Sequence, residues 1–174
     1  MTNEELSKLN FSGWPLPDDY VIEVGRVALL WAGLESFLIT CIGKLAGFNK
    51  PLDERAYILL AHSTFPQRLD NLSALCELLK DEFSHLADYE SVVALLRSAQ
   101  KARNRFVHNG AFFDEETGSY RMAVGSARGT IKTRVDRVSI EDVKRACVQI
   151  DEANRALYKL VLKRALPPAW QVRT

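Results

Sequence analysis

Apolar residues recur every three or four positions along four segments of the chain, and this spacing restricts the fold more than any other feature. The clearest stripe runs through residues 24–45 and consists of Val24, Val27, Ala28, Trp31, Leu34, Leu38, Ile42 and Leu45. A period near 3.6 places such residues on one face of an α-helix. Further stripes follow in 56–79, 92–106 and 143–161. We therefore expect an all-α protein, an antiparallel up-and-down bundle of four to five helices.

Helix boundaries are visible around the last two stripes. The third helix is expected from about Ser84 to about His108, because Asn109-Gly110 tolerates the left-handed backbone that ends helices. Ser139 and Asp142 resemble a capping box that begins the last helix, and Pro167-Pro168 is expected to end it.

Residues 111–138 interrupt the helical pattern. Residues 115–119, EETGS, have the composition of a turn. Apolar or β-branched residues occupy alternate positions in two runs, first at Tyr120, Met122 and Val124 and then at Ile131, Thr133 and Val135. We expect a small hairpin-like insertion or loop here, within a single domain of residues 1–174 whose helical core covers about 18–166.

Neither a secretory signal nor a membrane span is expected. The first residues, MTNEE, are acidic and lack an apolar core. The most apolar stretch, Val27–Phe48, contains Glu35 and Lys44 and is interpreted as a buried helix. The three cysteines are far apart, which fits buried free thiols in a reducing compartment. These features predict a cytoplasmic protein without membrane contact.

Charge is unevenly distributed along the chain, although the formal net charge is only +1. Residues 1–100 contain eight Lys or Arg against fourteen Asp or Glu, whereas residues 101–174 contain fifteen against eight. A basic half is typical of proteins that bind polyanions such as RNA. A solvated basic face gives the same composition, so both interpretations stay open.

The candidate catalytic residues lie in one short segment, Arg103-Asn104-Arg105-Phe106-Val107-His108. Arg103 falls on the apolar stripe of its helix, where a charge needs a partner or a function. A guanidinium matches phosphate oxygens, a histidine exchanges protons near neutral pH, and Asn104 could orient either group. The set suits phosphodiester cleavage. Alternatively, His108 is only a helix cap favoured by the helix dipole.

The sequence shows no cluster with metal-ligand spacing, no phosphate-binding glycine loop and no serine-nucleophile motif. We therefore expect neither a metal nor a cofactor. Cleavage without a metal needs an internal nucleophile, and the 2′-hydroxyl of RNA provides one.

The segment Arg103–His108 resembles the signature of the HEPN superfamily (higher eukaryotes and prokaryotes nucleotide-binding). That signature is an Arg, four to six residues and a His, often with Asn directly after the Arg. The run Trp31-Ala32-Gly33-Leu34-Glu35 also looks like the first helix of small bacterial members. The resemblance covers roughly residues 20–165 and implies a helical bundle that forms a homodimer.

The resemblance also implies a function. In active members, two Arg–His motifs meet at the dimer interface and cleave RNA without metal. Carried over, His108 would be the general acid or base, Arg103 would stabilise the charged transition state, and Asn104 would position them. Many relatives are toxins or defence ribonucleases that work with an antitoxin or a nucleotidyltransferase-like partner. Others are non-catalytic modules that bind nucleic acid or a partner protein, and this remains the alternative.

Further candidates lie outside this trio. Several basic residues could follow an RNA backbone, or could form a solvated basic face: Lys101, Arg105, Arg121, Arg128, Lys132, Arg134 and Arg137. Glu35, at the edge of the first helical stripe, could pair with Arg103 and orient it, or could be an exposed helix charge.

Overall fold

The structure is a computed structural model that describes residues 1–10, 13–48, 50, 52–126 and 132–171. In the described residues the elements follow in the order α1 (Asn3–Ser7), α2 (Asp18–Leu45), α3 (Glu54–Leu60), α4 (Phe65–Leu79), a 3-10 turn η1 (Ser84–Leu86), α5 (Tyr89–Val107), β1 (Gly110–Asp114), β2 (Ser119–Ser126), β3 (Lys132–Val138) and α6 (Ile140–Leu162).

The protein is mixed α and β, so the expectation of an all-α bundle is wrong. The expected hairpin-like insertion is a three-stranded antiparallel sheet in the order β1-β2-β3. The physical reason lies in the alternation along β2, which buries Met122 completely among the core residues. Val138 at the end of β3 is also buried. The sheet therefore extends the hydrophobic core beyond the helices.

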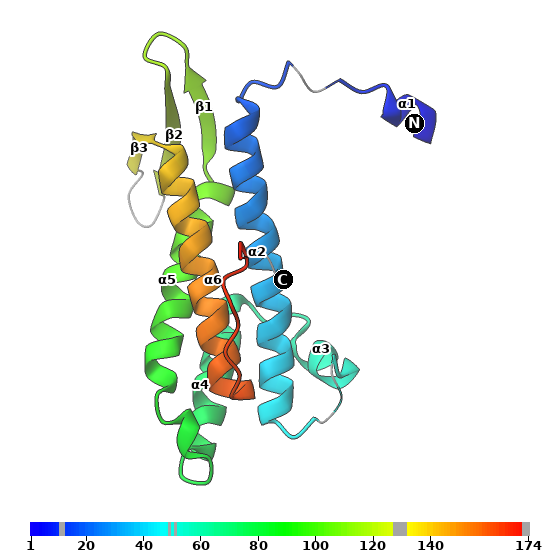
Figure 1. Cartoon of the computed structure of the whole chain (residues 1–174), viewed down its shortest axis with the longest axis vertical. Helices are drawn as coiled ribbons and strands as arrows, with labels where there is room; N and C mark the ends of the chain where they lie inside the picture. Colours follow the sequence, from blue (N-terminus) through cyan, green and yellow to red (C-terminus); the bar gives the residue numbers. More distant parts are fainter. Residues whose placement is uncertain (11–12, 49, 51, 127–131, 172–174) are drawn as a thin grey trace.

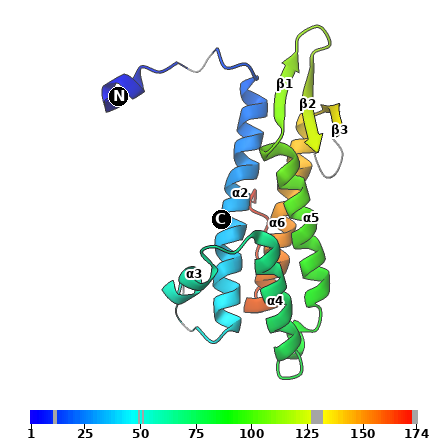
Figure 2. The same cartoon turned by 180° about the vertical axis from the view of Figure 1, so that it is seen from behind.

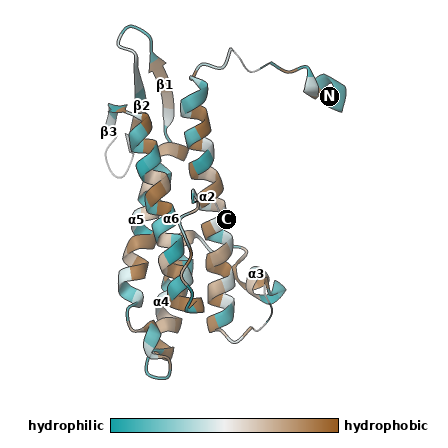
Figure 3. Cartoon of the chain, viewed as in Figure 1, coloured by the Kyte–Doolittle hydropathy of each residue, from teal (hydrophilic) through white to brown (hydrophobic). Residues whose placement is uncertain are grey.

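Three long helices, α2, α5 and α6, run side by side, and the sheet lies at the end where α5 ends and α6 begins (Figure 1). The shorter helix α4 packs on α2 and α5 along only the half of their length that is distant from the sheet (Figure 2). Apolar and polar residues alternate along each long helix (Figure 3), as amphipathic helices around a shared core require.

Helix α2 supplies much of the core. Its buried face includes Val27, Trp31, Leu34 and Leu38, as the spacing predicts. By length and composition alone this helix could cross a membrane, and 44% of its most apolar window is buried inside the structure. Its packing against α4, α5 and α6 makes it part of the hydrophobic core. The three cysteines are free and buried, as expected.

Two helix boundaries differ from the sequence prediction. The sequence predicts a third helix from about Ser84, but the structure has the 3-10 turn η1 at Ser84–Leu86 and a separate helix α5 that begins at Tyr89. The last helix ends at Leu162, where Lys163 adopts a left-handed backbone with φ of 57°, several residues before Pro167. Beyond this cap the chain returns along α6, and the amide of Ala169 donates to the buried carboxylate of Asp151 at 3.1 Å. The predicted capping box of Ser139 and Asp142 is confirmed.

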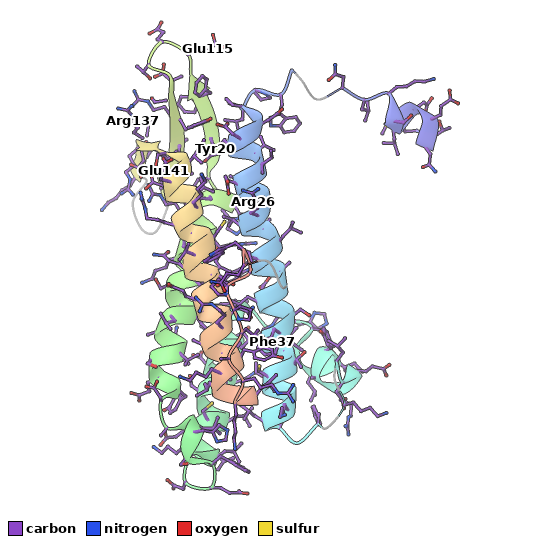
Figure 4. The ribbon with its side chains drawn as sticks, in the orientation of Figure 1. Tyr20, Arg26, Phe37, Glu115, Arg137 and Glu141 are labelled. Atoms are coloured by element: carbon purple, nitrogen blue, oxygen red, sulfur yellow. The ribbon has the colours of Figure 1, made fainter. Side chains whose placement is uncertain are left out.

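The sheet is anchored on the first turn of α2. The Tyr120 ring on β2 stacks on Tyr20 with centroids 4.6 Å apart, and the Tyr120 hydroxyl donates to Asp19 at 2.8 Å. Figure 4 labels Tyr20 between α2 and the sheet. Since side chains alternate along a strand, Tyr120 and Met122 define the inner face of the sheet, and Arg121 and Ala123 belong to its outer face.

Candidate active site

The Arg–His motif, residues 103–108, forms the last turns of α5. His108 is the C-terminal cap residue, and its backbone amide donates to the carbonyl of Asn104 at 3.3 Å. Asn109 closes the helix, because its side-chain amide donates to the carbonyl of Arg105 at 2.8 Å. The helix end thus fixes the backbone on which the candidate catalytic side chains stand.

The three predicted catalytic side chains converge. Arg103 and His108 are five residues apart, so the long Arg side chain reaches the end of its own helix. Its Nη1 donates to Asn104 Oδ1 at 3.0 Å and also contacts Nε2 of His108. The guanidinium is the centre of the cluster, with an amide oxygen and an imidazole nitrogen on the same nitrogen atom.

This contact places the imidazole of His108 beside a donor group. A guanidinium has N–H donors and no acceptor atom, so Nε2 is the imidazole atom that can accept from Arg103. His108 is exposed to solvent, so a substrate can also reach the imidazole.

Trp31 supplies the other side of the Arg103 environment. The guanidinium carbon lies 5.6 Å from the centroid of the buried Trp31 ring, which itself packs on Phe65 of α4 at 4.5 Å. Arg103 Nε is buried without a hydrogen-bond partner, and in the described part of the chain no carboxylate pairs with this guanidinium. Arg103 is therefore a half-buried cation whose charge no described carboxylate compensates, which favours the binding of an anion such as phosphate.

The motif opens onto a surface that α4 leaves uncovered. Val21, Ala28 and Glu35 are seven residues apart and lie along one face of α2. Glu35 Oε1 lies 4.0 Å from Arg68 Nη1 of α4, whereas Ala28 and Val21, nearer the sheet, are exposed.

Helix α5, like α2, contacts α4 only along the part that is distant from the sheet (Figure 2). Arg97 pairs with Asp70 of α4 at 3.1 Å, and Asn104 follows one heptad later on the same side of α5. Val107, beside His108, is 36% exposed. We call Asn104, Val107 and His108, at the end of α5, the open surface.

The structure shows no pair between Glu35 and Arg103 among the described residues. The carboxylate contacts Arg68 instead, because α4 meets α2 at this level while Arg103 lies nearer the sheet. Sequence spacing within α2 cannot reveal which helix packs opposite Glu35.

The two predicted RNA-contacting residues of α5 differ in their surroundings. Lys101 precedes Asn104 by three residues and His108 by seven, so it is exposed on the side of the helix that carries these two residues. Arg105 lies 5.4 Å from the Phe106 ring and lines a small cavity with Asp142 and Arg145 of α6. The structure therefore directs Arg105 toward α6 and leaves Lys101 on the side of the motif.

The basic residues of the sheet divide between its two faces. Arg121 and Arg137 are opposite one another on the outer face. Lys132 and Arg134 alternate with Val135 and therefore share the register of the inner face, beyond the part that packs on the helices. Arg128 lies outside the described residues.

Two residues of this site were not predicted from the sequence. The sequence places Trp31 on a helical stripe and in the run that resembles HEPN members, and neither feature indicates that Arg103 packs on it. Asn109 was read as a helix stop, and its side chain also holds the carbonyls of the last turn. Among the described residues, no three His, Cys, Asp or Glu side chains lie together as a metal site would require.

Comparison with known proteins adds no relative. The chain matches no protein-family model, no curated protein and no solved structure. The resemblance to the HEPN superfamily therefore rests on the motif and stays a prediction.

Proposed function

We propose that the protein is a metal-independent endoribonuclease of HEPN type that acts as a homodimer in the cytoplasm. The observation that supports this most directly is the cluster of Arg103, Asn104 and His108 at an exposed helix end, with a cation that lacks a carboxylate partner in the described residues. A bound phosphate would supply the missing anion.

In the proposed reaction the 2′-hydroxyl of RNA attacks the adjacent phosphorus. His108 Nε2 accepts the hydroxyl proton, and Arg103 stabilises the extra negative charge on the phosphorane oxygens. The bond from phosphorus to the 5′ oxygen breaks, and that oxygen takes a proton from a second histidine. The products are a 2′,3′-cyclic phosphate and a 5′-hydroxyl.

Phosphate binding would also free His108 to act as the general base. In the free protein, the Arg103 guanidinium occupies the Nε2 lone pair of His108. A phosphate competes for the guanidinium donors, which releases Nε2 to accept the proton. Binding and activation of the base are thereby coupled.

A second copy of the chain would supply the second histidine. One chain offers a single histidine at this site, while the reaction needs a base and an acid. The open surface carries the exposed, apolar Val107 beside His108, and two such surfaces related by a two-fold axis would bring both motifs together.

Product analysis tests the chemistry. Purified protein is incubated with a mixed-sequence RNA in EDTA, and the new ends are analysed by mass spectrometry. We expect cyclic phosphate ends with RNA and no cleavage of an oligomer with 2′-deoxyribose at every position. Cleavage that requires a divalent metal would refute the mechanism.

The alternative function is a non-catalytic dimer that binds nucleic acid or a partner protein. The contact of Arg103 Nη1 with His108 Nε2 favours it, because this contact blocks the ring nitrogen that would accept the proton from the substrate. RNA binding without any cleavage would decide for this alternative.

A further inference from the structure

A row of three side chains crosses the outer face of the sheet. Phe112 on β1, Arg121 on β2 and Arg137 on β3 are opposite one another in the strand register. Phe112 is 45% exposed, and Arg137 is exposed on the side of the sheet distant from α2 (Figure 4). Because neighbouring strands are about 4.8 Å apart, the row spans about 10 Å. We call these residues the arginine row.

The arginine row carries unbalanced positive charge. Like charges directly opposite in a sheet destabilise it. Asp114 compensates part of the charge, with its Oδ2 at 3.4 Å from Arg121 Nη2. Arg121 Nε is buried without a hydrogen-bond partner, and in the described ranges no carboxylate pairs with Arg137. An anion between the two guanidinium groups would remove the repulsion.

The next row leaves open space beside the Phe112 ring. It consists of Gly110, Ala123 and Val135, and all three are exposed. A Cβ atom built on Gly110 meets no atom within 4 Å. A flat ring can therefore lie over the sheet next to Phe112.

We infer that the arginine row binds one nucleotide of single-stranded RNA, with its base stacked on Phe112 and its phosphate between Arg121 and Arg137. Aromatic rings that stack bases, combined with cations that contact the backbone, are the usual means of binding single strands.

The inference rests on the proposed function, because it places part of the RNA substrate beside the Arg–His motif. Phe112 follows His108 by four residues, which span at most about 14 Å. A strand bound on this row can therefore continue to His108.

The other face of the sheet provides a matched control. Arg134, which the sequence alone offers as a possible RNA contact, lies in the inner-face register with its Nε 2.9 Å from Asp136 Oδ1, so the proposed site excludes it. It carries the same charge on the same small sheet but is distant from Phe112 in register. A general electrostatic effect would involve Arg134 and Arg137 equally, whereas the proposed site involves only Arg137.

The test measures binding of a fluorescein-labelled 2′-O-methyl oligouridine of about ten nucleotides, which the full chain can bind but not cleave. We expect Phe112→Ala and Phe112→Leu to weaken binding about 5- to 100-fold, and Phe112→Tyr to stay within about twofold, since only a ring can stack. Arg137→Gln should reduce the slope of log affinity against log salt by about 0.7, and Arg134→Gln should leave it unchanged. An abasic oligomer should bind wild type and Phe112→Ala equally.

The outcomes separate this inference from the proposed function. Unchanged binding by Phe112→Leu, in a wild type that cleaves RNA, overturns the stacking site alone. Loss of binding in a wild type that never cleaves supports the site and the non-catalytic alternative. A wild type that binds no oligomer overturns both. A change of oligomeric state in Phe112→Ala, measured by light scattering, would show that the ring contacts another copy of the chain and would also overturn the inference.

Discussion

The surface formed by α2 and α5 has two parts that differ in how their charges are compensated. Where α4 covers it, Glu35 pairs with Arg68 and Arg97 pairs with Asp70. At the Arg–His motif, Arg103 contacts an amide, an imidazole and an indole ring. No carboxylate among the described residues pairs with this half-buried guanidinium, which lies beside the one histidine of the motif. The proposed phosphate site needs such an uncompensated cation.

The largest expected effect comes from His108→Ala. Loss of the proton acceptor should lower the cleavage rate at least about a hundredfold. The thermal midpoint should change little, because the side chain is exposed at a helix end. His62→Ala, at an exposed position before α4, is the matched control and should cleave normally. Equal activity of both variants would remove His108 from the mechanism.

A pair of arginine variants tests the comparison directly. Arg103→Ala should lower kcat about 10²- to 10³-fold and cost about 1 kcal/mol of unfolding free energy through its lost packing on Trp31. Arg97→Ala removes an exposed ion pair, so it should cost less than about 1 kcal/mol and leave cleavage unchanged. Kinetics and urea unfolding provide the two measurements. If Arg97→Ala lost cleavage as Arg103→Ala does, the distinction between paired and unpaired cations would fail.

Dimerisation is the next effect in size. Val107→Glu would place like charges at the two-fold axis and should weaken the dimer at least about tenfold, with cleavage lost in proportion. Leu78→Glu, on the exposed side of α4, adds the same charge to the covered part of the molecule and should leave the dimer intact. Sedimentation at micromolar concentration measures both. A wild type that stays monomeric would exclude a site composed of two copies.

The helical spacing predicts the course of α2, α4 and α6 well, because one buried face dictates the period. It predicts the close approach of Arg103 and His108, which depends only on positions within one helix. It does not predict the partner of Glu35 or the contact of Arg103 with Trp31, since these depend on which helices pack together. The sheet was underestimated because the alternation along residues 120–124 is short, and burial of Met122 depends on its anchoring to α2.

The smallest expected effect concerns that anchor. Tyr120→Phe removes the hydrogen bond to Asp19 and should cost about 0.5–1.5 kcal/mol near pH 7, with cleavage within about twofold of wild type. Burial and the hydrogen bond to Asp19 raise the pKa of Tyr120 to about 12. Above about pH 10 the unfolded chain releases this proton while the folded chain retains it, so wild-type stability falls as pH rises.

The phenylalanine variant has no such proton to release. The stability difference between the two proteins should therefore narrow as the pH rises from about 10 toward 12. Urea unfolding at about pH 10 and at about pH 12 measures this difference in stability. Tyr158→Phe is the control, because the Tyr158 ring stacks on Phe37 at the far end of α2. A difference that stays constant with pH would show that the Tyr120 hydroxyl does not retain its proton in the folded state. If Tyr120→Phe lowers the stability but leaves cleavage unchanged, the attachment of the sheet to α2 does not affect the Arg–His motif at the end of α5.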